Sequence, residues 1–89
     1  MASPAAGATG SYPGVPVDLH RLRTVFPDRF AALLRQHFRG PSHVSVFFNV
    51  DERTARDWWH GRFAPSGVFV AVAIATLPGA VAYLMGEAA

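Results

Sequence analysis

The stretch NVDERTARDWWHG, residues 49–61, combines a helix start signal with a strongly two-sided helical pattern. Asp51 is a good N-cap residue, and Glu52 in the following turn suits the positive end of a helix dipole. Ala55 and Trp58 lie three residues apart and therefore share an inner face. The outward positions are Glu52, Arg53, Arg56, Asp57 and His60. We predict a helix that runs to about His60 and ends at Gly61.

The chain before this stretch predicts an arm, a short helical turn and a first full helix. Residues 1–18 are rich in Ala, Gly, Ser and Pro without an apolar stripe, which predicts a flexible arm. Residues 19–26 predict a short helical turn. Pro27 suits a first helical position, and apolar residues then recur at helical spacing to about residue 38. Gly40-Pro41 ends the pattern.

A short second helix and a turn connect that first helix to the opening stretch. Ser42 is the expected N-cap, and the helix extends to about Phe48. Its predicted buried side chains are Val44, Phe47 and Phe48. Asn49 is the expected turn residue because Asn tolerates a left-handed backbone, and Val50 then enters the core.

The C-terminal part predicts two further helices. After a loop at 62–66, one helix covers about 67–76, and Pro78 opens another to about Met85. We therefore expect an all-α domain of four to five helices over residues 19–89. Residues 68–85 carry no charge, and a membrane span is an alternative for this run, although Pro78 and Gly79 interrupt it. If they stay uncovered, four apolar side chains there would form a patch for a homodimer or another transcription protein: Val70, Ile74, Tyr83 and Leu84.

Composition limits the chemistry of the 89-residue chain. There is no Cys, so disulfides and thiolate metal sites are excluded, and nothing indicates an oxidising compartment. The histidines His20, His37, His43 and His60 show no spacing typical of a metal site, and we predict no cofactor. Neither a glycine-rich phosphate loop nor a nucleophile paired with a base is present, so we predict no enzyme. The net charge is +2, and all eight cations are Arg, a residue that matches phosphates and guanine edges.

Residues 43–61, HVSVFFNVDERTARDWWHG, resemble the helix-turn-helix of the phage-repressor type, the Cro and XRE-like family. That motif has a small residue four places before the turn residue, then a hydrophobic residue, a capping residue and a helix with two inward side chains. These places are occupied in order by Ser45, Asn49, Val50, Asp51, Ala55 and Trp58. The family usually has Ala where this chain has Ser45, and Gly where it has Asn49.

The resemblance implies binding to double-stranded DNA. The helix pair covers about 42–60, and its second helix would lie in the major groove. It implies base contacts from Glu52, Arg53, Arg56 and Asp57. The expected phosphate contacts are Arg35, Arg39, Thr54, His60 and Arg62. The family also implies a cytoplasmic bacterial transcription regulator related to phages or mobile elements, of which a regulator of a gene-transfer particle is one example.

Two other interpretations remain open from the residues alone. The charges of residues 52–57 also fit a solvated helix face with ion pairs inside the helix. The apolar C-terminal half also fits a helical protein-interaction module of a larger regulator. Adjacent helical positions point about 100° apart, so Trp59 is expected to be partly exposed when Trp58 is buried.

Overall fold

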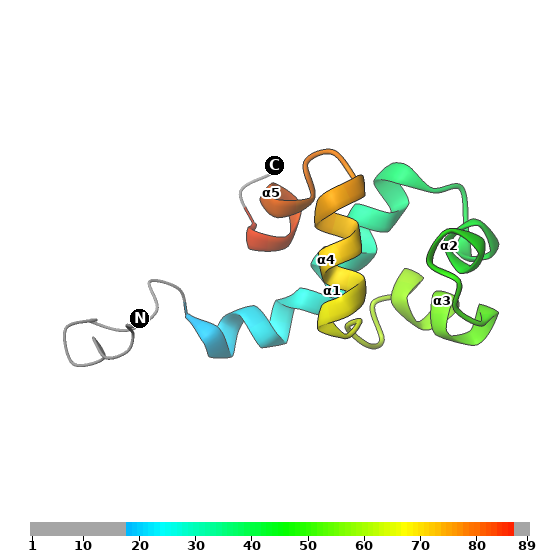
Figure 1. Cartoon of the computed structure of the whole chain (residues 1–89). Helices are drawn as coiled ribbons and strands as arrows, with labels where there is room; N and C mark the ends of the chain where they lie inside the picture. Colours follow the sequence, from blue (N-terminus) through cyan, green and yellow to red (C-terminus); the bar gives the residue numbers. More distant parts are fainter. Residues whose placement is uncertain (1–17, 87–89) are drawn as a thin grey trace, which may run out of the picture.

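The computed structural model describes residues 18–86, which form five α-helices and no strand within that range (Figure 1). The helices are α1 (Leu19–His37), α2 (Pro41–Phe48), α3 (Glu52–Trp59), α4 (Gly67–Thr76) and α5 (Ala80–Met85). The predicted all-α class is confirmed. The predicted arm lies outside the described residues except for Asp18, and so does the end of the predicted domain, residues 87–89.

The first helix begins earlier than predicted. Residues 19–26 are not a separate turn, because α1 runs without interruption from Leu19 and contains Pro27. The Asp18 carboxylate caps it by accepting a hydrogen bond from the Arg21 backbone N–H at 3.1 Å. An interior proline removes one backbone hydrogen bond and bends a helix, and Figure 1 shows α1 changing direction along its length. The Asp18 cap and the packing of Phe26 against Phe30 and the core support the part of α1 that precedes Pro27.

The turn between α2 and α3 has the predicted backbone. Asn49 adopts the left-handed conformation with φ 56° and ψ 50°, and it is the one non-glycine residue with positive φ among residues 18–86. The start of α2 differs from the prediction, because the helix begins at Pro41 and its N-cap is Gly40. Ser42 therefore does not cap α2.

An aromatic cluster joins four of the five helices. Trp58 of α3 meets Phe30 of α1 and Phe48 of α2 edge to face, each with ring centroids 5.6 Å apart, and Phe69 of α4 lies 5.1 Å away. Edge-to-face pairs at these separations add to the stability that burial alone provides. Phe47 departs from the prediction. It packs on Phe48 but keeps 43% of its surface exposed.

The C-terminal half folds back over this cluster. The fifth helix starts two residues later than predicted, at Ala80, because Gly79 turns the chain with φ 77°. Pro78 and Gly79 thus lie between α4 and α5, and the run 68–85 is not one helix. Within residues 18–86, none of the helices has both the length and the apolarity needed to cross a membrane.

Side chains of α1 hold α5 and the preceding turn in place. The Arg29 guanidinium donates to the Leu84 carbonyl at 3.3 Å, and the Tyr83 hydroxyl donates to Gln36 Oε1 at 3.1 Å. His37 Nε2 lies 2.9 Å from the Pro78 carbonyl oxygen. Leu84 is buried at 3% exposure and Tyr83 is half-buried, so these two residues do not form the predicted uncovered patch.

Candidate nucleic-acid interface

The inner side of α3 is anchored as the sequence predicts. Ala55 is fully buried and Trp58 is 4% exposed, whereas Trp59 is half-buried against the same core. The Asp51 carboxylate caps the helix by accepting a hydrogen bond from the Thr54 backbone N–H at 2.9 Å. This anchoring settles which side of α3 faces solvent.

The turn before α3 is closed by Ser45. Its hydroxyl donates to the Val50 carbonyl at 2.6 Å, and the Val50 N–H donates to the Ser45 carbonyl at 3.1 Å. Both residues are half-buried, and Val50 packs against the core beside the buried Phe48. The Ser45 side chain therefore adds a specific hydrogen bond to the turn.

The outer side of α3 carries the predicted charged residues. Glu52, Arg53 and Arg56 are exposed. Arg56 lies 3.7 Å from the Glu52 carboxylate, and their side chains are 53% and 62% exposed. Glu52 also accepts a hydrogen bond from the Ser42 hydroxyl at 3.2 Å, which links α3 to the beginning of α2. Among residues 18–86, Arg53 forms no ion pair.

Asp57 is held differently from its neighbours. Arg62 lies 3.2 Å from the Asp57 carboxylate, and the Asp57 side chain is only 21% exposed whereas that of Arg62 is 59% exposed. The Arg62 backbone N–H also donates to the Asp57 carbonyl at 2.9 Å. A contact between Asp57 and a ligand requires this pair to separate, so Asp57 is less available than Arg53.

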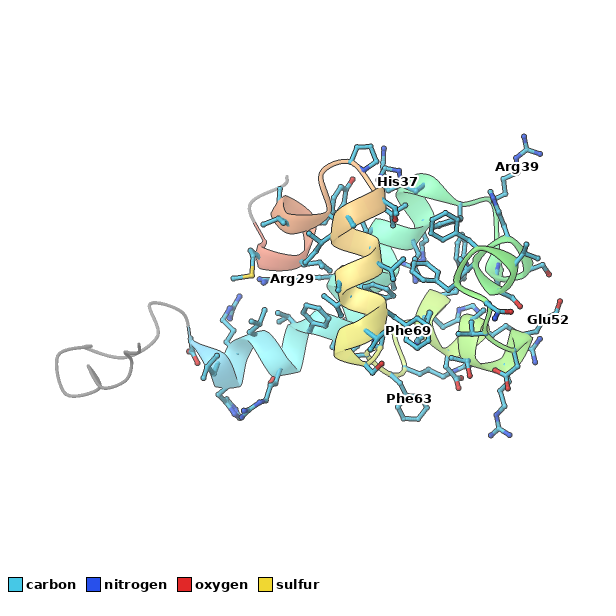
Figure 2. The ribbon with its side chains drawn as sticks, in the orientation of Figure 1. Arg29, His37, Arg39, Glu52, Phe63 and Phe69 are labelled. Atoms are coloured by element: carbon cyan, nitrogen blue, oxygen red, sulfur yellow. The ribbon has the colours of Figure 1, made fainter. Side chains whose placement is uncertain are left out.

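The predicted phosphate contacts fall into two groups. Arg39 is exposed and, like Arg53, forms no ion pair with any residue of 18–86. Figure 2 shows Arg39 and Glu52 pointing away from the body at the end that α2 and α3 form. Arg35, in contrast, donates to the Trp59 carbonyl at 2.7 Å and thereby satisfies a C-terminal carbonyl of α3. The sequence pattern contains no signal for this bond, because 24 residues separate the two positions.

Thr54 and His60 flank the exposed row. Thr54 is half-buried, and His60 is exposed with its backbone N–H bonded to the Arg56 carbonyl. Hydrogen bonds from Thr54, through its side chain and its backbone N–H, hold the pKa of the Asp51 carboxyl below its ordinary value of 3.8. The charges of Arg53 and Arg56 act in the same direction. Asp51 therefore stays ionised and capping α3 at neutral pH.

The chemistry of this surface follows from these positions. Arg53 and Arg56 present planar donors, Glu52 presents an acceptor, and all three lie on one exposed helix side. Donors and acceptors of this kind match base edges, and the arginine donors also match acidic protein groups. Within residues 18–86, no three His, Asp or Glu side chains gather as a metal site requires.

Comparison with known proteins yields no relative. No family model, no curated protein sequence and no solved structure matches the chain.

Proposed function

We propose that the chain binds double-stranded DNA with sequence preference and acts in transcription regulation. The observation that carries the proposal is the exposure of Arg53 and Arg56 on the side of α3 opposite the buried Ala55 and Trp58. Arg53 in particular is free of any ion pair within residues 18–86, so its guanidinium is available to a ligand without breaking an existing bond.

The size of α3 suits the major groove. An α-helix with its side chains is about 10–12 Å in diameter, and the major groove of B-DNA is about 12 Å wide. In a helix-turn-helix the second helix enters the groove while the first crosses the backbone. The tight turn at Asn49 holds α2 against α3, and the Ser42–Glu52 hydrogen bond joins their exposed ends.

Each polar residue then has a distinct proposed role. Arg53 and Arg56 pair with guanine, and Glu52 accepts from the amino group of cytosine. Asp57 contacts a base only where Arg62 leaves the Asp57 carboxylate and binds a phosphate instead. Arg39, which is exposed and unpaired among the described residues, is the principal phosphate contact. The other proposed phosphate contacts are Arg35, Thr54, His60 and Arg62.

The charge balance of this surface limits the affinity of one copy. Two acidic and two basic residues share α3, and the whole chain carries a net charge of only +2. Affinity for DNA rises with the number of phosphates neutralised, so a single copy binds weakly and useful affinity requires a second copy or a second domain. The resemblance favours a cytoplasmic bacterial regulator of phage or mobile-element genes, including those for gene-transfer particles.

Selection of bound sequences from random duplexes, followed by gel shifts with the selected site, tests the proposal. We expect Arg53→Ala and Arg56→Ala each to weaken binding about 10- to 100-fold, because a bidentate base contact contributes about 1–3 kcal/mol. Val46→Ala, at a position 81% exposed on α2, is the matched control and should bind as the parent does. Circular dichroism should show equal helicity in all four proteins. Equal binding by the parent and both arginine variants would contradict the assigned face.

A salt titration separates the two kinds of arginine. Arg39→Ala should reduce the slope of log K against log salt by about 1 and weaken binding equally for all sequences. Arg53→Ala should instead lower the preference for the selected site over a scrambled duplex. Identical effects of the two substitutions would show that Arg53 contacts backbone and not bases.

A protein-interaction module is the second candidate function. It is favoured by the large exposed side chains of α4, where Val68 is 70% and Ile74 is 47% exposed. The salt titration also distinguishes the candidates, because a module without DNA affinity shows no salt-dependent binding to duplexes.

A further inference from the structure

The first two turns of α1 project beyond the hydrophobic core. The α1 residues that form the core or pack against it begin at Phe26, and none of residues 19–25 is among them. Figure 1 shows this part of α1 extending away from the other helices, at the end of the molecule opposite α2 and α3. Contacts with the core therefore do not explain which side chains this segment carries.

This segment nevertheless carries apolar residues along one side. Leu19, Leu22 and Val25 follow one another at intervals of three, so they share a side of the helix, and we call them the α1 stripe. Leu19 is 45% exposed, and Leu22 and Val25 are half-buried. The α1 stripe thus leaves apolar surface in contact with solvent that a partner could cover.

An exposed arginine lies along each edge of the α1 stripe. Arg21 and Arg23 are the chain neighbours of Leu22, and adjacent helical positions point about 100° to either side. Both arginines are exposed, and neither forms an ion pair with any residue of 18–86. The Asp18 carboxylate accepts a hydrogen bond from the Arg21 backbone N–H and caps the helix. A cation in the first turn is unfavourable for the helix dipole, so local helix stability does not account for Arg21.

We propose that this segment of α1 binds an acidic amphipathic helix of another protein. The apolar side of the partner covers the α1 stripe, and carboxylates on both of its edges pair with Arg21 and Arg23. Charge complementarity determines the kind of partner, because both flanking side chains are cations without an ion pair among the described residues. The inference concerns the end of the molecule far from α3, and it does not depend on DNA binding.

A carboxylate-bearing helix matches this surface better than DNA or a membrane does. Contacts with DNA are mostly hydrogen bonds to phosphates and base edges, which would leave the α1 stripe uncovered. A helix that lies in a membrane surface has a large apolar side and many cations on its polar side. Three apolar residues between two arginines match one side of a short partner helix.

Probe peptides test the proposal with the full chain. The first probe is a fluorescent amphipathic helix of about 14 residues, a length near the lower limit for an isolated helix, with Leu on its apolar side and Glu on both edges. Two control probes carry Gln or Lys at the Glu positions. Fluorescence anisotropy at low salt should give a dissociation constant on the order of 100 μM for the Glu probe, because the contact is small. The Gln and Lys probes should bind at least about 10-fold more weakly, since the ion pairs are lost.

Substitutions in the chain locate the contact. Arg21→Gln and Arg23→Gln should each weaken binding of the Glu probe about 2- to 5-fold, the effect of one exposed ion pair. Val46→Glu is the matched control, because it lowers the net charge by the same amount at an exposed site on α2, and it should bind as the parent does. The double variant Arg21→Glu/Arg23→Glu should instead prefer the Lys probe. Glu near the start of a helix favours the dipole, so this variant should keep its helicity, which circular dichroism checks.

Several results would overturn the proposal. They are equal binding of the Glu and Gln probes, an effect of Val46→Glu as large as that of Arg21→Gln, and a double variant that still prefers the Glu probe. Binding to phosphatidylserine vesicles or to duplex DNA that depends on Arg21 and Arg23, without binding of the Glu probe, would assign this surface to another partner and also overturn it. Each of these failures would leave the proposed function of α3 intact, so the two proposals fail separately.

Discussion

Helices α3 and α4 bury similar inner sides but have opposite outer sides. Four of the eight residues of α3, in the sequence ERTARDWW, are charged, whereas GVFVAVAIAT in α4 contains no charge. On the inner side, Trp58 of α3 meets Phe69 of α4 at 5.1 Å. The same kind of core contact therefore supports a polar surface in one region and an apolar surface in the other. One small domain thus has a charged surface on α3 and an uncharged surface on α4.

The ends of the two helices differ in the same way. Asp51 caps α3 through a side-chain hydrogen bond, whereas Ser66, the N-cap of α4, makes no such bond. Helix α3 is thus defined by its local sequence as well as by packing. Helix α4 depends on its packing against the core, because short helices without caps are only marginally stable alone.

The largest expected effect comes from the residue that both regions share. Trp58→Ala should destabilise the domain by about 3–5 kcal/mol, because it removes a buried aromatic side chain and leaves a cavity. The total free energy of unfolding of a domain of this size is about 5–15 kcal/mol. The melting temperature should therefore fall by roughly 12 °C or more. Thermal denaturation followed by circular dichroism measures the change.

The Trp58 comparison needs a variant outside the shared core. Val46→Ala changes a side chain that is 81% exposed, and its melting temperature should match that of the parent within error. If Trp58→Ala melts within a few degrees of the parent, the packing of α3 against α4 does not hold the two regions together.

The left-handed turns at Asn49 and Gly79 should respond with intermediate effects. Asn49 has φ 56° between α2 and α3, and Gly79 has φ 77° between α4 and α5. Asn49→Ala and Gly79→Ala should each cost about 1 kcal/mol, since an L-residue with a Cβ is strained there. Apart from Gly79 and its two chain neighbours, no residue has an atom within 4 Å of the place that a Cβ at Gly79 would occupy, so the cost is one of backbone conformation alone.

Urea denaturation provides the measurement for both turns. Each alanine variant should show a lower midpoint with an unchanged slope. Asn49→Gly is the matched control, because glycine adopts this conformation without strain, and it should be neutral or slightly stabilising. An Asn49→Ala variant as stable as the parent would mean that the turn relaxes to another backbone conformation.

The smallest expected effect concerns the helix caps and depends on pH. Hydrogen bonds from Thr54, followed by the nearby arginine charges, lower the Asp51 pKa in the folded state, so ionised Asp51 stabilises the fold above the ordinary value of 3.8. That contribution is lost as the pH falls through the lowered pKa. Asp51→Ala should melt below the parent at pH 7, and the two melting temperatures should converge in strong acid.

Ser66→Ala is the counterpart of this change in α4. Because Ser66 makes no side-chain cap hydrogen bond, its replacement should leave the melting temperature unchanged at every pH. A pH-independent gap between the parent and Asp51→Ala would show that the cap acts through shape and not through charge.

Local signals predicted α2, α3 and the turn between them well. The Asp51 cap, the left-handed Asn49 and the buried pair Ala55 and Trp58 are confirmed, and the bounds of α3 and α4 agree with the expected ranges. These features depend on residues within a few positions of each other. The roles in DNA binding stay predictions.

The incorrect predictions have two physical causes. Pro27 and Ser42 each carry a boundary signal, but α1 begins at Leu19 and α2 begins at Pro41. In both cases an earlier residue also favours the beginning of a helix. That residue is Asp18 for α1 and Pro41 for α2. Phe47 was expected to be buried and Leu84 was expected to be a candidate for exposure, and the structure reverses both expectations. Their surroundings are made by helices distant in sequence.

The sequence by itself determined the all-helical class, the turn at Asn49 and the polar outer side of α3, because caps, left-handed residues and a two-sided pattern act over a few residues. Only the tertiary structure decided which side of α4 is covered, since a helix that is apolar all round carries no sign of its inward direction. It also decided that Arg35 binds the end of α3 and that Arg62 covers Asp57. Such contacts depend on how the fold brings separate segments together, and the spacing of apolar residues within one helix does not predict them.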